Sequence, residues 1–295
     1  MRRSQLNLAL LVVAAGLGAA VFFSQKKPEK GAPLTPLAED AINKLHIEHP
    51  DAPAIQLEKL GGEWLLTEPV RTPADAIEIK GVLNVATLET RSTLKPADVN
   101  LADLGLKPPQ FSVTVNEQKL EFGNVEPLQY RRYVRAGEKI VLVDDPPGTA
   151  LDKDYSDLVA KQLIPETAEI TQIALPGLGI ARTADGKSWQ LTPGNSAAGA
   201  DQKQKLVDAW KNARAMWNAA EPAGGSKGDE VTVSLKDGTA LKFIVVERDP
   251  QLILARPDLK VRYTLSKALT DELLQLPEDK KEEPKKAEKP AEAPK

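Results

Sequence analysis

The sequence predicts an α+β fold built from two tandem copies of one unit. Short segments of alternating apolar residues, separated by turn residues, outnumber the helical segments and group as hairpins. The body of the chain also matches itself in a constant order. The matched pairs are 42–47 with 170–175, Trp64 with Trp189, 111–115 with 231–235, and 162–165 with 275–277.

We place the first copy at residues 40–165 and the second at 168–277, each of ordinary domain size. Each copy is predicted as a mainly antiparallel β unit with one packed helix and a short closing helix. We expect Trp64 and Trp189 to occupy matching buried positions. The later strands are expected at 111–115, 119–123, 130–135 and 139–144 in copy one, and at 231–236, 240–246, 252–256 and 261–265 in copy two.

A helix is predicted after the first strands of each copy. In copy one, residues 72–75 supply an N-cap Thr, a Pro at the first helical position and an acid in the first turn. Apolar residues at helical spacing then follow in both copies. They are Ile79, Val82, Leu83 and Ala86 in copy one, and Leu206, Trp210, Ala213 and Trp217 in copy two.

The composition excludes several classes of function. The chain has no Cys, which rules out disulfides, thiolate catalysis and iron–sulfur ligation. The chain has only two His residues, so few imidazole groups are present that could act as a general acid or base. A pI near 5.7 argues against nucleic-acid binding. We therefore expect a protein that is not an enzyme and that needs no cofactor.

The N-terminus contains an uncharged apolar run at residues 6–23, roughly 27 Å of helix at about 1.5 Å per residue. A cleaved signal peptide is the alternative, but Phe22 and Phe23 stand where small residues should precede cleavage. We predict an anchor or signal segment at 1–25 that holds the chain in the inner membrane by a single pass. A short basic head before a long domain favours a body in the periplasm or outside.

Two segments of biased composition flank the predicted copies. Residues 26–39 contain Pro, Gly and mixed charge and are expected to be an extended tether. Residues 278–295 consist of Lys, Glu, Asp, Pro and Ala, which bury too little apolar area to offset chain entropy. We therefore expect the tail at 278–295 to be disordered.

An ordered set of motifs resembles the bacterial domain of unknown function 4340 family. The motifs are Trp64-x-Leu66 with Pro69, Ala74-Asp75, Leu104-Gly105-Leu106 with Pro109, Phe122-Gly123, Tyr133-Val134-Arg135, and Val141-x-Val143-Asp144. The resemblance implies an N-terminal membrane segment and an exported body. Some members of that family are similar to auxiliary components encoded beside ABC-type transporters of the gliding-motility kind, so the resemblance also suggests a role of this sort. It supplies no catalytic residues.

Arg131, Tyr133 and Arg135 are the best candidates for a partner-binding surface. On a strand these three side chains share one face, while Tyr130, Arg132 and Val134 share the other. An anionic partner such as a glycan or a lipid head group suits this face. The alternative is a solvated strand on which the Arg stems cover the Tyr rings.

Four further motifs are expected to be structural. A metal site at His46, Glu48 and His49 lacks a third convergent ligand. The acids at 144–145 and 152–157 fail the calcium-loop pattern and are expected to cap a helix. Gly177-x-Gly179 is expected to be a hairpin bend. Trp210, Met216 and Trp217 are expected on one helix, in the core rather than in a ligand groove.

Three hypotheses of function remain, from different classes. The first is a membrane-anchored periplasmic scaffold or binding module that acts with a partner protein, with a transporter as the suggested partner. The second is a solute- or glycan-binding protein with a cleft between the two copies. The third is a hydrolase that uses a pair of carboxylates.

The anchor hypothesis predicts that residues 6–23 stay on the mature protein. The reason is the absence of a small-x-small cleavage site near Phe22 and Phe23. The intact mass of the chain purified from its host membranes measures this directly. A mature N-terminus near residue 21 or 25 would contradict the anchor and indicate a soluble exported protein.

Overall fold

The computed structural model describes residues 31–144, 153–194 and 198–277, together with residues 13, 16 and 17. Apart from those three residues, the predicted anchor at 6–23 lies outside the described part. The predicted tail at 278–295 and the start of the tether lie outside it as well. Among the residues that are described, no helix is long and apolar enough to cross a membrane.

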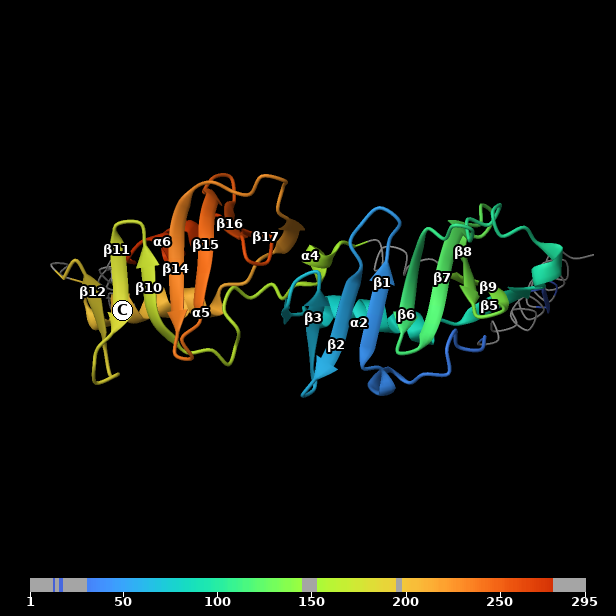
Figure 1. Cartoon of the computed structure of the whole chain (residues 1–295), viewed down its shortest axis with the longest axis horizontal. Helices are drawn as coiled ribbons and strands as arrows, with labels where there is room; N and C mark the ends of the chain where they lie inside the picture. Colours follow the sequence, from blue (N-terminus) through green and yellow to red (C-terminus); the bar gives the residue numbers. More distant parts are fainter. Residues whose placement is uncertain (1–12, 14–15, 18–30, 145–152, 195–197, 278–295) are drawn as a thin grey trace, which may run out of the picture. The chain divides into compact units, whose positions relative to one another are not determined.

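The fold is mixed, with two antiparallel sheets and few helices (Figure 1). The nine strands of the first sheet are β1 (Lys44–Glu48), β2 (Ile55–Leu60), β3 (Glu63–Glu68), β4 (Thr72–Pro73), β5 (Thr90–Leu94), β6 (Phe111–Val115), β7 (Gln118–Val125), β8 (Arg131–Ala136) and β9 (Lys139–Asp144). The eight strands of the second sheet are β10 (Ile170–Leu175), β11 (Leu178–Arg182), β12 (Trp189–Thr192), β13 (Trp217–Ala220), β14 (Asp229–Leu235), β15 (Ala240–Glu247), β16 (Leu252–Arg256) and β17 (Val261–Leu265).

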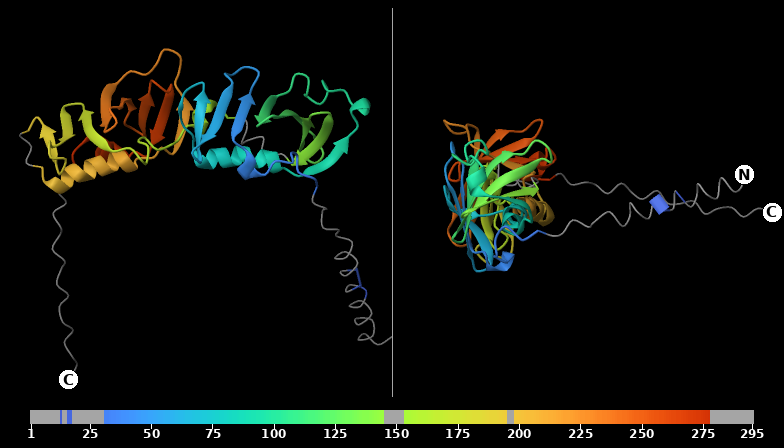
Figure 2. Two further views of the ribbon diagram at one scale, coloured as in Figure 1. Left: turned by 60° about the horizontal axis from the view of Figure 1, so that its bottom comes forward. Right: turned by 90° about the vertical axis from the view of Figure 1, so that its right-hand side faces the viewer.

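Within residues 31–144, 153–194 and 198–277, the helical elements are short except for α5. The α-helices are α2 (Ala76–Leu83), α4 (Tyr155–Leu158), α5 (Ala200–Asn212) and α6 (Leu269–Leu274), and the 3-10 turns are η1 (Glu39–Ala41), η2 (Asn84–Thr87) and η3 (Pro96–Asp98). Helix α5 runs across one face of the second sheet, and α2 lies on one face of β1–β3 (Figure 2). The predicted strands 111–115, 139–144, 252–256 and 261–265 are observed with the same bounds.

The two sheets share one strand order. The first runs β4-β3-β2-β1-β6-β7-β8-β9-β5, and the second runs β12-β11-β10-β14-β15-β16-β17-β13. Without β4, each strand of the first sheet has a counterpart at the same place in the second. Trp64 and Trp189 lie in the counterpart strands β3 and β12. Both are half-buried rather than buried, because the core positions of these strands belong to Leu66 and Leu191.

The chain packs into two compact units whose boundaries differ from those of the sequence repeat. The first unit contains the described residues of 31–42 and 83–144, and the second contains those of 43–82 and 153–277. Strands β1–β4 therefore belong to the second unit and β5–β9 to the first. The largest fully buried side chains of the second unit include Trp210, Tyr263 and Phe243.

A short linking segment, residues 158–163, organises the second unit. On one side it pairs with the chain before α2: Asp75 N donates to Leu158 O (2.8 Å) and Ala160 N donates to Pro73 O (3.0 Å). On the other side it pairs with the chain after α5, where Leu163 N donates to Ala213 O (3.1 Å). The chain before α2 and the chain after α5 are thus joined through backbone hydrogen bonds to the same segment.

Asp75 is a buried carboxylate at this junction. Its Oδ1 accepts hydrogen bonds from Ile77 N (3.1 Å) and Glu78 N (3.3 Å), so it caps α2. The predicted N-cap at Thr72 is therefore wrong, because Thr72 and Pro73 form strand β4 and the helix begins only at Ala76. Its Oδ2 accepts from Arg214 Nη2 at 2.7 Å. A carboxylate this deeply buried requires such partners, because unpaired burial of a charge is costly.

Glu78 adds a second ionic contact to the junction. Its two carboxylate oxygens lie 2.6 Å from Lys153 Nζ and 2.5 Å from Lys161 Nζ. Burial by itself would raise the pKa of Glu78, but the hydrogen bonds from both lysines outweigh it and lower that pKa. The first turn of α2 is therefore tied to the chain on both sides of α4.

The predicted helix of copy two is too long at its C-terminal end. Helix α5 ends at Asn212, and Trp217 begins the edge strand β13 with its side chain partly exposed. The expectation that Trp210, Met216 and Trp217 share one helix is therefore wrong. The reason is tertiary: Ala213 O and Ala215 N bond to the linking segment, which draws this backbone out of the helix. The strands β4, β5 and β13 are likewise absent from the sequence prediction.

Trp210 is a fully buried tryptophan and should contribute strongly to stability. Its ring lies 5.3 Å from that of Phe243, and its Nε1 donates to Leu273 O at 2.8 Å. We expect Trp210→Ala to lower the free energy of unfolding by about 3–5 kcal/mol. Trp217→Ala, the control at a half-exposed site, should lower it by clearly less, on the order of 1 kcal/mol. Urea titration measures both, and equal effects would contradict this placement of the core.

Candidate interaction surface

Strand β8 carries the three residues singled out in the sequence. Arg131, Tyr133 and Arg135 alternate along β8 with the buried Val134, so they share one face as predicted. Arg132 lies on the core side instead, where its guanidinium stacks 5.5 Å above the Phe111 ring and donates to Gly123 O at 2.8 Å.

The predicted strand 130–135 begins one residue late in the structure. Strand β8 starts at Arg131, and Tyr130 lies outside it with φ of 54°. The expectation that Tyr130 continues the face of Arg132 and Val134 is therefore wrong. Its positive φ breaks the alternation of the strand, and its side chain is largely exposed.

The arginines of this face are already paired with acids. Arg131 Nε lies 3.5 Å from Asp144 Oδ1, and Arg135 Nη1 lies 3.3 Å from Glu121 Oε2. Arg91 donates to Asp144 Oδ2 through Nε (2.9 Å) and Nη2 (2.7 Å). An anionic ligand would have to compete with these carboxylates, so the face is ordered and charge-balanced rather than openly basic.

Asp144 is the centre of this ion-pair cluster. The hydrogen bonds from Arg91 are the main reason that the pKa of Asp144 is lowered, and the charge of Arg131 lowers it further. Asp144 ends β9 directly opposite Arg131 in the strand register, and β5 supplies Arg91 from the edge. The cluster therefore ties three neighbouring strands of the first unit together.

The family motifs with glycine build the base of the surface. A Cβ added at Gly123 would lie 2.2 Å from Leu104 O, so only glycine fits at this point of β7. Asn124 N donates to the same Leu104 O at 2.8 Å. The β7–β8 register shifts between Phe122 and Val125, which marks a bulge beside the hairpin loop.

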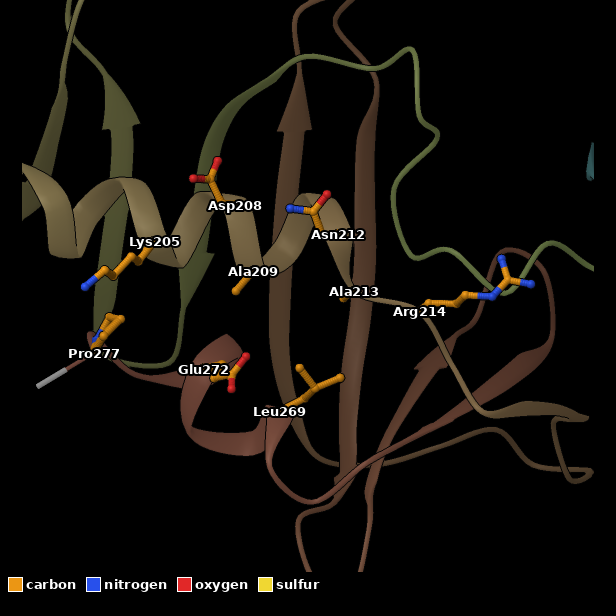
Figure 3. A pocket seen from close by; sticks show the side chains of 9 residues that line it. All are labelled: Lys205, Asp208, Ala209, Asn212, Ala213, Arg214, Leu269, Glu272 and Pro277. Carbon is orange, nitrogen blue, oxygen red and sulfur yellow. The ribbon is translucent and has the colours of Figure 1, made fainter.

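A second candidate is a groove between α5 and α6 with a volume of about 610 Å³ (Figure 3). It is lined by Lys205, Asp208, Ala209, Asn212, Ala213, Arg214, Leu269, Glu272 and Pro277. All of these belong to copy two, so this groove is not the predicted cleft between the copies. Figure 3 shows the side chains of Leu269 and Glu272 on the side of α6 that faces α5.

The groove leaves no distinctive signal in the sequence. Lys205, Asp208 and Asn212 recur at helical spacing on the polar side of α5, which is also typical of an ordinary solvated face. The other wall of the groove is formed by α6, which contributes Leu269 and Glu272 and is distant from α5 in sequence. Only the tertiary structure brings the two helices together.

The remaining motifs have structural roles in the described residues. His46 Nε2 lies 3.3 Å from Glu48 Oε1 on β1, and no group of three or more His, Asp or Glu side chains in the described part is placed to hold a metal ion. Asp154 caps α4 by accepting from Ser156 N at 2.7 Å, as expected. Gly177 adopts a positive φ in the turn between β10 and β11, which confirms the hairpin bend. Asp145 and Asp152 lie outside the described residues.

The chain was compared with protein families, curated proteins and solved structures. The family model described as domain of unknown function (DUF4340) matches residues 64–273, which is more than half of the chain. No curated protein and no solved structure matches the chain.

The pairing of Asp144 predicts an acid-dependent loss of stability. Because its folded-state pKa is lowered below the ordinary value of 3.8, its contribution is present above that value and is lost as the pH falls toward the folded-state pKa. Asp144→Asn removes this contribution at every pH. The stability gap between wild type and variant, measured by urea titration, should therefore be largest above about pH 5 and shrink in acid. A gap that stays constant with pH would contradict the ion pair.

Proposed function

The chain belongs to the DUF4340 family, and from this premise we propose that it is a non-enzymatic, membrane-anchored scaffold or binding module whose body lies outside the cytoplasm. The apolar run at residues 6–23 supports the anchor in the inner membrane. The family resemblance supports a partner protein, with an ABC-type transporter as the expected class. The proposal includes no cofactor and no nucleic acid.

The observation that carries the proposal is the ordered face of β8. Arg and Tyr are among the residue types that dominate binding energy in protein interfaces. Here Arg131 and Arg135 are held by Asp144 and Glu121, so less side-chain entropy remains to be lost on binding. Tyr133 lies between them on the same face. A face with these properties suits a protein surface of mixed charge.

A solute- or glycan-binding function is the second candidate, and the groove between α5 and α6 favours it. Its volume of about 610 Å³ is within the range of small-molecule sites. The lining includes the opposite charges of Lys205 and Glu272 together with the apolar side chains of Ala209 and Leu269. Such a lining suits a small dipolar solute.

We also infer that the body is a tandem duplication. The shared strand order of the two sheets supports this inference. Each copy would then contain one packed helix, α2 or α5, and one short closing helix, α4 or α6. The copies are proposed at 40–165 and 168–277, with the tether at 26–39 and the tail at 278–295.

The proposed surface predicts graded losses of function. In a host strain that lacks the chain, Arg131→Ala, Tyr133→Ala and Arg135→Ala should each restore the phenotype only in part. Arg248→Ala is the matched control, because Arg248 is also an arginine paired with an acid, Asp229, at 2.5 Å. It should restore the phenotype fully. Protein abundance is measured in every strain.

Two outcomes would contradict the proposal. If all three β8 variants restore the phenotype fully at normal abundance, the β8 face is not needed for function. Complete loss of function on replacing one exposed Asp, Glu or His, again at normal abundance, would favour the hydrolase hypothesis instead.

A further inference from the structure

The loop between β7 and β8 presents two large apolar side chains to solvent. Leu128 is 86% exposed and Tyr130 is 74% exposed. Single exposed apolar residues are common on protein surfaces and need no explanation. Two of them within three residues, at the tip of one hairpin, form a small apolar projection that water solvates poorly.

The loop is held in place by its own hydrogen bonds. The Glu126 carboxylate accepts from Leu128 N (2.9 Å) and from Gln129 N (3.0 Å), and Glu126 N donates to Arg131 O at 2.6 Å. These bonds close the loop across its base and fix the backbone on which Leu128 stands. The projection is therefore preorganised, which reduces the entropy lost on binding.

The backbone at Tyr130 supports the same conclusion. Its φ of 54° lies in the left-handed region, which a bulky residue rarely adopts and which Gly or Asn adopts at lower cost. The sequence nevertheless has Tyr here, with its side chain largely in solvent. A side chain kept at an unfavourable backbone position is consistent with a role for the ring itself.

The base of the loop is rigid. The bulge after Phe122 and the glycine contact with Leu104 O hold the end of β7, and Arg132 fastens the start of β8 to Phe111 and Gly123 O. The family motifs thus support the strand ends from which the loop projects.

The charges beside the loop decide between two kinds of partner. Attachment to an anionic membrane uses Lys or Arg whose charge is not balanced by acids. Here Arg131 lies beside Asp144, Arg132 is on the core side, and the Glu126 carboxylate is occupied within the loop. Among the described residues beside the loop, carboxylates thus offset the arginines, which suits an apolar pocket on a protein better than an anionic membrane surface.

We propose that Leu128 and Tyr130 insert as a pair of anchors into an apolar pocket of a protein partner, with the β8 face as the polar rim of the same interface. This inference rests on the proposed function and assigns its contact point. Tyr is a frequent anchor of such interfaces, and a polar rim around it excludes water.

The cysteine-free chain allows a site-specific test. Gln129→Cys, between the two anchors, creates a single attachment point for a thiol-reactive photo-crosslinker in the full-length chain. After illumination of host membranes, the yield of a discrete protein adduct is compared among variants. We expect Leu128→Ser and Tyr130→Asn each to lower the yield at least about tenfold, as hot-spot losses do. Glu126→Ala should lower it less, because both side chains remain.

The control is Ile77→Ser, since Ile77 is also a large apolar residue and is 73% exposed in α2. It should leave the yield unchanged. Circular dichroism and a urea titration check that every variant folds, which is expected because both anchors are exposed. An adduct that survives both anchor substitutions in folded protein would overturn the proposal.

A second arm tests the other occupants. The full-length Gln129→Cys variant, labelled at its one thiol with a polarity-sensitive dye, is reconstituted into vesicles of phosphatidylethanolamine and phosphatidylglycerol. A blue shift without any partner protein would show insertion into lipid and overturn the proposal, as would an adduct between two copies of the chain. If the anchor variants restore the host phenotype fully while the β8 variants do not, the proposed function stands and this inference fails.

Discussion

The burial of Asp75 is the constraint on which the second unit depends. A carboxylate at this depth is tolerated only with full hydrogen bonding, and the chain supplies it from α2 and from Arg214, which follows α5. These hydrogen bonds bring the N-terminus of α2 next to the chain that follows α5. The linking segment then completes the junction, because its backbone pairs with both sides. The second unit therefore contains residues from both predicted copies.

Charge pairing has a different consequence at the β8 face. The sequence displays three arginines and two tyrosines in six residues, which suggests a basic surface. The fold places Asp144 and Glu121 beside Arg131 and Arg135 and directs Arg132 to the core side, so most of this positive charge is offset locally. What remains is an ordered polar face next to an apolar loop. That combination is typical of protein interfaces, which surround apolar anchors with a polar rim.

Elements that depend on interactions between neighbouring residues were predicted correctly, whereas elements that depend on partners distant in sequence were missed. Hairpins such as β14–β15 were predicted because alternation and an Asp-Gly turn are local signals. The edge strands β5 and β13 were missed because each forms only through pairing with a strand distant in sequence, β9 or β17. The predicted helix continued to Trp217 because the apolar spacing continues to that residue. In the structure, α5 ends at Asn212 because the backbone that follows forms hydrogen bonds with the linking segment.

By itself the sequence determined the fold class, the strand segments of the hairpins, the family and the face shared by Arg131, Tyr133 and Arg135. All of these depend on residue type and on spacing along the chain. Only the tertiary structure decided which charges are neutralised, where the groove forms and how the loop holds Leu128 and Tyr130. Those properties depend on partners that are far apart in sequence, or on one backbone angle, and neither leaves a periodic pattern in the chain.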